Sequence, residues 1–402
     1  MRLTSRLCLP LMKQIGKKLD FYSQFIPSSL SIQQYLDFGR SGDQTSSYLW
    51  LRKELLVRLA NIMKEVSFLP PELLEQRSSL LVSEWYQQSF HDLLFFENLP
   101  PSSDTLDGFN ETLKHVLSRH VNVVQTMAEG LMELKRSHGL DIWGKRNMEY
   151  FLDRFYLNRI SIRMIINQHL LVFGAKLPES PRHVGAIDPA CDVVAVVEDA
   201  FENSRFLCDQ YYLRSPAMKV ETQNVVDHEQ HEITVTAVPS HLYHILFELL
   251  KNSMRAVVET HDEDSDLPDL RVFITKGPHD LCIKVCDRGG GLPIAMVGEL
   301  FEYMYSTAPP PESDSPQAPL AGYGYGLPLS RLYARYFQGD ITLVPMEGYG
   351  TDACVYMKAL APEAKEQLPI YSTSSKRLLT QKPQAADWSQ PFPSGGSMNH
   401  MR

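Results

Sequence analysis

The sequence predicts an α+β protein of two domains, with an N-terminal antiparallel four-helix bundle and a C-terminal α/β sandwich containing a mixed sheet. Three observations support this fold class. The chain has 402 residues, enough to bury two hydrophobic cores. Apolar residues recur at helical spacing from about residue 46 to residue 174. Beyond about residue 190, helical segments are interspersed with short runs of β-branched residues, which is typical of helices packed on a sheet.

The clearest helical pattern of the first half runs from Leu106 to Leu134. Its members are three or four residues apart, which places them in one stripe of a single long helix. They are Leu106, Phe109, Leu113, Val116, His120, Val124, Met127, Leu131 and Leu134. Similar amphipathic segments are expected at Leu51–Val66, Leu80–Phe96 and Met148–Leu171. Four long helices with short polar connections predict the antiparallel bundle.

The connection Gly174–Pro189 interrupts the helical periodicity with prolines and predicts the domain boundary. Beyond it, the expected helices are Val193–Leu213, His241–Glu259 and Leu327–Phe337. The expected strands are Glu232–Val238, Leu270–Lys276, Leu281–Asp287, Ile341–Pro345 and Ala353–Lys358. From about Pro362 onward, polar residues and prolines dominate, as in a weakly structured tail.

The composition excludes several classes of protein. The net charge of −9 argues against general nucleic-acid binding, and no apolar run is long enough to span a membrane. The six cysteines contain no CxxC pair, which favours reduced thiols over disulfides or zinc ligands. The tract His228–Glu232 does not match HExxH and gives little support to a zinc site. Residues 1–20 are basic and have no acid before Asp20, which suits a mitochondrial leader or, equally, a basic first helix.

The segment Glu248–Ala256 carries an unusual polar stripe on its predicted helix. The residues His244, Glu248, Lys251, Asn252 and Arg255 fall within an arc of roughly 100° when each residue advances by 100°. A solvent-exposed face is the ordinary explanation. However, asparagine is a poor helix former. Three glycine-bearing segments also follow along the chain, so convergence on one cavity is the sharper interpretation.

The first of these segments, Cys286–Pro293, places Asp287 at a strand end before three glycines, where a carboxylate can accept a hydrogen bond from an exocyclic amine. The second, Gly322–Ser330, alternates glycines before a helix, an arrangement that can hold phosphates at the helix N-terminus. The third, Gly348–Ala353, is a predicted hairpin turn with Thr351 as its polar residue. Each one alone is weak evidence.

Together and in this order, the stripe and the three segments resemble the GHKL ATPase/kinase superfamily over about 239–358. The protein-kinase motifs and the P-loop are missing from the sequence. Nearly the whole chain, from about Phe25 to Trp388, further resembles the mitochondrial pyruvate dehydrogenase kinases. The stretches that carry this likeness are Phe151–Met164, Pro239–Ala256, Leu300–Pro309, Ala321–Asp340 and the pair Asp387-Trp388.

The resemblance implies an ATP-dependent serine kinase that phosphorylates and inactivates the E1 α subunit of the pyruvate dehydrogenase complex, and so regulates glucose oxidation. It divides the chain into a leader (1–20), a regulatory and lipoyl-binding bundle (21–175), a GHKL kinase domain (185–361) and a tail (362–402). It also implies ATP and Mg²⁺, a homodimer, the lipoyl domain of E2 as a partner, and the mitochondrial matrix. Neither nucleic acid nor membrane insertion is expected.

The resemblance also assigns roles to residues. Glu248 would be the general base, His244 would orient it, and Asn252 would bind Mg²⁺. The nucleotide would be held by Glu248, Lys251, Asn252, Arg255, Asp287, Gly289, Gly291, Ser306, Thr307, Gly322, Tyr323, Gly324, Tyr325, Gly326, Leu327 and Thr351.

A second site is implied in the bundle, where a small acid such as pyruvate would be sensed. It would be lined by Tyr86, Ser89, His120, Ile162, Arg163 and Ile166. Relatives tend to carry an arginine where this chain has Leu117, which predicts weaker inhibition by pyruvate. Asp387 and Trp388 would cross to the other subunit and support lipoyl-domain binding.

Three alternatives remain at this stage. The branched-chain ketoacid dehydrogenase kinase fits less well around Leu300–Pro309 and in the tail. A histidine kinase or ATPase of the same fold would need an acceptor, for which His120 is the candidate, although a buried core histidine is the plainer interpretation. A non-catalytic scaffold that binds the lipoyl domain would not need the set Glu248, Asn252 and Asp287.

Overall fold

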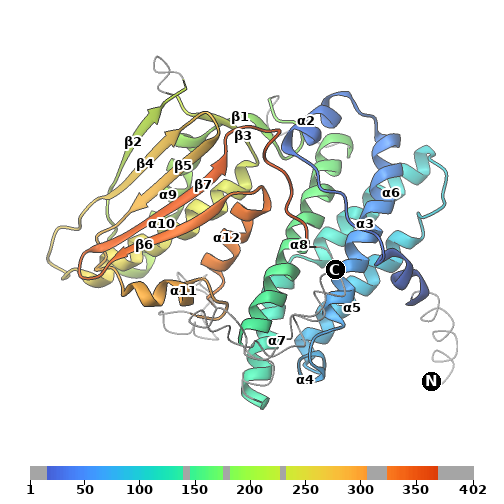
Figure 1. The fold of residues 1–402 in the computed structure, drawn as a ribbon, viewed down its shortest axis with the longest axis horizontal. Coiled ribbons are helices and arrows are strands. Elements are labelled where there is room, and N and C mark those ends of the chain that lie inside the picture. Colours follow the sequence, from blue (N-terminus) through green and yellow to red (C-terminus); the bar gives the residue numbers. More distant parts are fainter. Residues whose placement is uncertain (1–15, 139–144, 175–181, 227–231, 306–323, 370–402) are drawn as a thin grey trace, which may run out of the picture.

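The computed structural model describes residues 16–138, 145–174, 182–226, 232–305 and 324–369. Figure 1 shows two parts side by side, one helical and one built around a sheet. The parts meet at α8 of the helical part and α12 of the sheet part. None of the described helices is long and apolar enough to cross a membrane. The predicted class, a helical N-terminal part followed by a mixed sheet with helices, is confirmed.

The helical part contains α2 (Ile32–Ser41), α3 (Gln44–Val66), α4 (Pro71–Leu74), α5 (Arg77–Leu94), α6 (Ser103–Arg119), α7 (Val123–His138) and α8 (Lys145–Phe173). Three of the predicted helical segments correspond to α3, α5 and α8. Buried leucines and aromatic residues of these helices, such as Leu55, Phe109 and Phe155, form one continuous core.

The single long helix expected from Leu106 to Leu134 is wrong, because α6 ends at Arg119 and α7 begins at Val123. His120 is the C-cap of α6 and leaves the helical conformation. Arg159 of α8 donates from Nη2 to the carbonyl oxygens of His120 and Val121, at 3.2 and 3.3 Å, and so satisfies groups that the helix end exposes. The hydrophobic spacing continues across the break because both helices face the same core.

The second part contains β1 (Asp188–Asp192), α9 (Val193–Tyr212), β2 (Met218–Asn224), β3 (Thr234–Ala237), α10 (Pro239–Thr260), β4 (Leu270–Lys276), β5 (Asp280–Cys286), a 3₁₀ turn η2 (Ile294–Met296), α11 (Val297–Leu300), α12 (Gly326–Tyr336), β6 (Asp340–Met346) and β7 (Gly350–Lys358). The five-stranded sheet has the order β2-β4-β5-β7-β6, while β1 pairs with β3. Only the β2–β4 pair of the five-stranded sheet is parallel, so the sheet is mixed.

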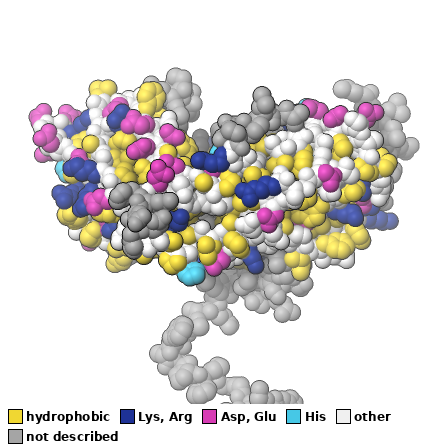
Figure 2. Space-filling model, turned by 90° about the horizontal axis from the view of Figure 1, so that it is seen from above, with side chains coloured by type: hydrophobic (Ala, Val, Ile, Leu, Met, Phe, Trp, Pro, Cys, Tyr) yellow, Lys and Arg dark blue, Asp and Glu magenta, His cyan; other side chains and the backbone are white. Residues whose placement is uncertain are grey.

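The buried face of this sheet carries alternating residues such as Val272, Ile283 and Val355, which pack against α9, α10 and α12. Helix α12 contributes to both cores, since Leu332 belongs to the helical part and Ala334 to the sheet part. This helix therefore links the two parts, and Figure 1 shows it between the sheet and α8. On the face drawn in Figure 2, acidic and basic side chains of the described residues are interspersed with apolar ones.

After β7 the chain crosses back to the helical part, as Figure 1 shows. There Ile32 N donates to Ala364 O at 2.9 Å, and Glu366 N donates to Leu30 O at 2.9 Å. We call residues 361–369 the return segment.

Candidate active site

Helix α10 supplies one wall of the candidate active site. It begins with Pro239 at its first position and buries Leu242, Leu246, Leu249 and Val257 against the sheet. The opposite face of the helix therefore turns its polar side chains away from the sheet. This face borders a cavity of about 220 Å³ between α10, the end of β5, α11 and the start of α12.

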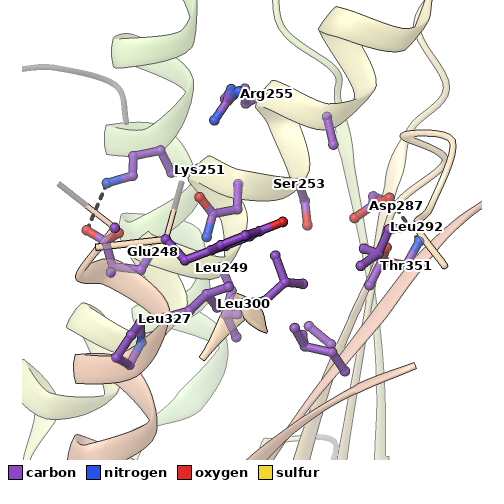
Figure 3. A pocket seen from close by; sticks show the side chains of 18 of the residues that line it. Glu248, Leu249, Lys251, Ser253, Arg255, Asp287, Leu292, Leu300, Leu327 and Thr351 are labelled. Carbon is purple, nitrogen blue, oxygen red and sulfur yellow. Dashed lines mark hydrogen bonds and ion pairs between the residues drawn. The ribbon is translucent and has the colours of Figure 1, made fainter. Parts of the chain in front are cut away.

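The cavity is lined by polar residues at both ends and by apolar residues between them. Its polar members are Glu248, Lys251, Asn252, Ser253, Arg255, Glu259, Asp287 and Thr351. Its other members are Leu249, Ala256, Leu292, Leu300, Tyr305, Gly324, Gly326, Leu327, Pro328, Leu343 and Ala353. In Figure 3, Glu248 and Lys251 lie at one end and Asp287 and Thr351 at the other.

The Glu248 carboxylate is held between two neighbours. Lys251 Nζ donates to Glu248 Oε1 at 2.8 Å, and the side chains of both residues are largely buried. The other oxygen, Oε2, abuts Gly326, the first residue of α12: a methyl group added there would lie 2.1 Å from it. Only glycine allows the helix start to approach the carboxylate so closely.

His244 lies one turn before Glu248 on α10. Its Nε2 is buried and makes no hydrogen bond within the described part of the chain. Burial lowers the pKa of His244 and Lys251 acts in the same direction, while the Glu248 charge opposes them. The ring packs against Tyr333 of α12, with 4.8 Å between ring centroids. A neutral imidazole beside Glu248 can orient it without competing for its charge.

Asp287 closes the other end of the cavity. Its Oδ1 accepts from the backbone N–H of Gly289 at 2.9 Å and of Thr351 at 3.1 Å, which joins two of the predicted glycine segments. Burial raises the pKa of Asp287, while hydrogen bonds from Gly289, Thr351 and Ser253 hold it down. Because both backbone bonds go to Oδ1, Oδ2 keeps acceptor capacity for a ligand.

The remaining residues of the stripe, Asn252 and Arg255, also line the cavity. Within the described residues the Asn252 side chain makes no hydrogen bond, so its amide is available to a ligand. Arg255 also lines the cavity but donates to Glu259 Oε1 at 2.8 Å. Its charge is therefore partly compensated before any ligand arrives.

Three predicted nucleotide-binding residues do not line the cavity. Gly289 packs against Ala256, and Gly291, with φ of 61°, lies so close to the carbonyl oxygen of Met346 that a methyl group would be 2.2 Å from it. Both glycines allow close packing of the loop after Asp287. Tyr325 is buried and packs against Tyr303, with ring centroids 5.3 Å apart.

Gly324, Gly326, Leu327 and Thr351 do line the cavity, as predicted. Ser306, Thr307, Gly322 and Tyr323 lie outside the described residues. Sequence reasoning missed Ser253, Glu259 and the apolar lining. Ser253 follows Asn252 directly, but helical spacing places it on the side of the helix that carries Leu249 and Ala256, so the polar stripe did not include it.

Two family models match this chain. Residues 237–361 match the family described as histidine kinase-, DNA gyrase B- and HSP90-like ATPase. Residues 29–188 match the family described as mitochondrial branched-chain alpha-ketoacid dehydrogenase kinase.

The relatives cover the whole chain. A Caenorhabditis elegans protein named "Probable [pyruvate dehydrogenase (acetyl-transferring)] kinase, mitochondrial" is 62% identical over 99% of both chains. The [pyruvate dehydrogenase (acetyl-transferring)] kinase of Ascaris suum is 61% identical over 99% of this chain and 100% of its own. The chain belongs to the mitochondrial pyruvate dehydrogenase kinase family. Human isozyme 3 of this kinase is 51% identical over 95% of both chains.

The residues predicted for a small-acid site in this kinase are brought together in the helical part. Tyr86 and His120 have ring centroids 4.5 Å apart, and Ser89 Oγ lies 3.0 Å from His120 Nε2. Burial lowers the pKa of His120 to about 4, with Arg159 and Arg163 acting in the same direction. A neutral, 2% exposed His120 is poorly placed to accept a phosphoryl group, which disfavours the histidine-kinase alternative.

Several polar atoms around His120 are buried and lack partners among the described residues. They are Tyr86 Oη, Arg163 Nη1, Arg159 Nε and both side-chain polar atoms of Asn158. Ile162 and Ile166 are buried on the same helix, α8. Sequence reasoning missed Asn158 and Arg159, although each lies four residues before a predicted member.

Proposed function

We propose that this chain is an ATP-dependent protein serine kinase that phosphorylates the E1 α subunit of the pyruvate dehydrogenase complex and thereby inactivates it. The observation that carries the proposal is the position of the Glu248 carboxylate, held by Lys251 against the start of α12 at one end of the cavity. Family membership supports the complex as the substrate.

The lining residues fit ATP. Asp287 offers an acceptor to the exocyclic amine of adenine, and the apolar middle of the cavity suits the base. Backbone N–H groups at the start of α12 can hold phosphate oxygens, because a helix N-terminus is a natural anion site. The available amide of Asn252 suits Mg²⁺, which prefers oxygen ligands.

In the reaction, the γ-phosphoryl group of ATP passes to the substrate serine oxygen and ADP leaves; Asn252 would hold Mg²⁺, which would offset the phosphate charge. Glu248 accepts the proton of the substrate serine hydroxyl, and neutral His244 orients that carboxylate. Lys251 fixes Oε1 of Glu248 and adds positive charge near the phosphates. The apolar side chains of Leu249, Leu292 and Leu300 line the cavity and reduce the access of bulk water to it. Positioning and charge stabilisation are the main requirements of phosphoryl transfer.

A radiolabelled ATP assay with purified E1 and E2 tests this proposal. Glu248→Gln should lower labelling of E1 serine by about 10²- to 10⁴-fold, the usual contribution of a general base, while ATP binding is retained. Glu299→Gln changes an exposed side chain of α11 that does not line the cavity; it is the control and should behave as wild type. Unchanged labelling by Glu248→Gln would refute the base assignment. Label on the protein's own histidine instead would favour the histidine-kinase alternative.

We also propose that the helical part binds the lipoyl domain of E2. An apolar cavity of about 340 Å³ lies between α2, α3 and α8 and includes Phe38, Trp50, Leu51, Ile165 and Phe173. Its volume and lining suit a lipoyl group on its lysine arm. Lipoylated E2 domain should bind more tightly than the unlipoylated domain in calorimetry, and equal affinities would overturn the assignment. The assisting pair Asp387 and Trp388 lies outside the described residues.

The small-acid site is proposed on the partnerless atoms around His120. Two arginines, Arg159 and Arg163, have no acidic partner among the described residues, and a carboxylate ligand would complement them. Arg163→Gln should abolish any inhibition by pyruvate without altering uninhibited activity. A wild-type kinase insensitive to pyruvate would count against this site and would agree with the departure at Leu117.

The remaining proposals concern assembly, location and domain limits. The face of the sheet opposite α9, α10 and α12 exposes Val344, Met346 and Tyr356, which suits a homodimer contact. Sedimentation of the wild type and Tyr356→Asp would test this contact. The mitochondrial matrix is proposed as the location of the chain on the basis of the proposed substrate.

The proposed domain limits are 1–20, 21–175, 185–361 and 362–402. Residues 16–22 are helical, and Lys18 donates to Glu97 at 2.7 Å.

A further inference from the structure

A buried ionic cluster joins four segments that are far apart in the sequence. Its centre is Glu366 of the return segment, which is 3% exposed. Arg58 of α3, which is fully buried, donates to both carboxylate oxygens: Nη1 to Oε1 at 3.1 Å and Nη2 to Oε2 at 2.9 Å. The backbone N–H of Leu30 donates to Oε2 at 3.0 Å. Water does not compete for these contacts, so the carboxylate is held firmly.

Two tyrosine hydroxyls converge on the same carboxylate oxygen. Tyr35 of α2 donates to Glu366 Oε1 at 2.7 Å, and Tyr336, the last residue of α12, donates to that oxygen as well. Burial and the neighbouring Glu366 charge raise the pKa of both tyrosines, so both hydroxyls keep their protons and act as donors. Because Oε1 also accepts from Arg58, the three donors share limited acceptor capacity, and displacement of one alters the bonds of the others.

Each tyrosine lies on a helix that borders a different cavity. Tyr35 lines the apolar cavity of the helical part. Tyr336 ends the same helix whose first residue, Gly326, abuts Glu248 in the candidate active site. The ten steps of continuous helix from Gly326 to Tyr336 span about 15 Å, so a shift of Tyr336 along the helix axis also moves Gly326.

We propose that Glu366 is a positioning residue that couples the apolar cavity to the nucleotide cavity, through Tyr35 on one side and through Tyr336 and α12 on the other. The inference rests on the proposed function in taking a lipoyl group as the occupant of the apolar cavity. An occupant that moves Tyr35 changes the bond between Glu366 and Tyr336, and nucleotide bound at the start of α12 acts on Tyr35 in return. Such coupling is reciprocal by thermodynamic necessity.

Hydrogen exchange of the full chain, with and without Mg-ADP, tests the relay without any occupant of the apolar cavity. In the wild type, Mg-ADP should change the exchange rate of the amides of residues 29–35 by about fivefold or more. Tyr336→Phe removes one hydroxyl and touches neither cavity, so it should reduce this response to less than about twofold. The matched control is Tyr22→Phe, whose hydroxyl donates to Glu97 at 2.6 Å outside the cluster, and it should respond as wild type.

An equal response in Tyr336→Phe and wild type, or no response in wild type, would overturn the relay. If Tyr336→Phe fails to fold, Tyr35→Phe removes the hydroxyl on the other side and should give the same loss.

A second measurement adds lipoylated E2 domain and follows ADP affinity, which should shift about fivefold in wild type and not in Tyr336→Phe. Failure of the domain to bind wild type contradicts the proposed docking alone, and hydrogen exchange then decides the relay. Binding without any shift in ADP affinity overturns the relay.

Discussion

Gly326→Ala is the sharpest test of how α12 and Glu248 are arranged. The added methyl carbon would lie 2.1 Å from Glu248 Oε2 and 3.0 Å from its Cδ, whereas ordinary contacts begin near 3.4 Å. The carboxylate must therefore retreat by about 1 Å. It is the far end of a flexible side chain, so the fold can accommodate this change, but the bond from Lys251 to Oε1 is strained or broken.

A displacement of about 1 Å of a catalytic group costs on the order of 10²-fold in rate. We therefore expect kcat for E1 phosphorylation to fall about 100-fold. Gly326 is not among the glycines with positive φ, and alanine is a good residue for a helix start, so the free energy of unfolding should change by less than about 1 kcal/mol.

The assay is initial-rate phosphorylation of E1 by purified kinase at saturating ATP, with urea unfolding measured in parallel. Gly298→Ala is the matched control, because nothing lies within 4 Å of the methyl group added there. Wild-type kcat in Gly326→Ala would refute the reasoning, since Glu248 would then tolerate displacement. An equally inactive Gly298→Ala would show that the assay reports stability instead of position.

Three further predictions follow. Asp287→Asn replaces an acceptor with an amide that can turn a donor toward the ligand, and calorimetry should show ATP binding about 10- to 100-fold weaker; unchanged affinity would remove Asp287 from the site. Arg58→Met leaves Glu366 and Glu54 buried without their cation. Urea unfolding should show a free energy of unfolding lower by about 3–5 kcal/mol, whereas a solvent-exposed cluster would give a loss near zero. Burial lowers the pKa of His169 to about 4. Between about pH 6.5 and pH 4 the unfolded chain therefore binds a proton that the folded chain does not. In that range the free energy of unfolding decreases by about 1.4 kcal/mol for each unit by which the pH is lowered. His169→Gln should reduce that slope, whereas the exposed control His91→Gln should not.

Much of the second part could be predicted from local sequence. The elements β4 and β5 follow their alternating apolar residues, and α10 follows its apolar face. Two strands were missed. β1 has only five residues, and β2 is an edge strand whose side chains are mostly exposed, so neither needs the alternation that reveals a strand.

The sequence alone determined which side chains share the polar face of α10, because helical spacing fixes that face wherever the helix lies. The glycine-bearing segments of the sequence also indicated where the backbone can lie close to other groups. Only the tertiary structure decided that Gly326 abuts Glu248, that His120 ends a helix, and that Glu366 lies between two tyrosines. These contacts join segments up to hundreds of residues apart. Periodicity reports which residues face a core, and only packing selects the partners that they meet there.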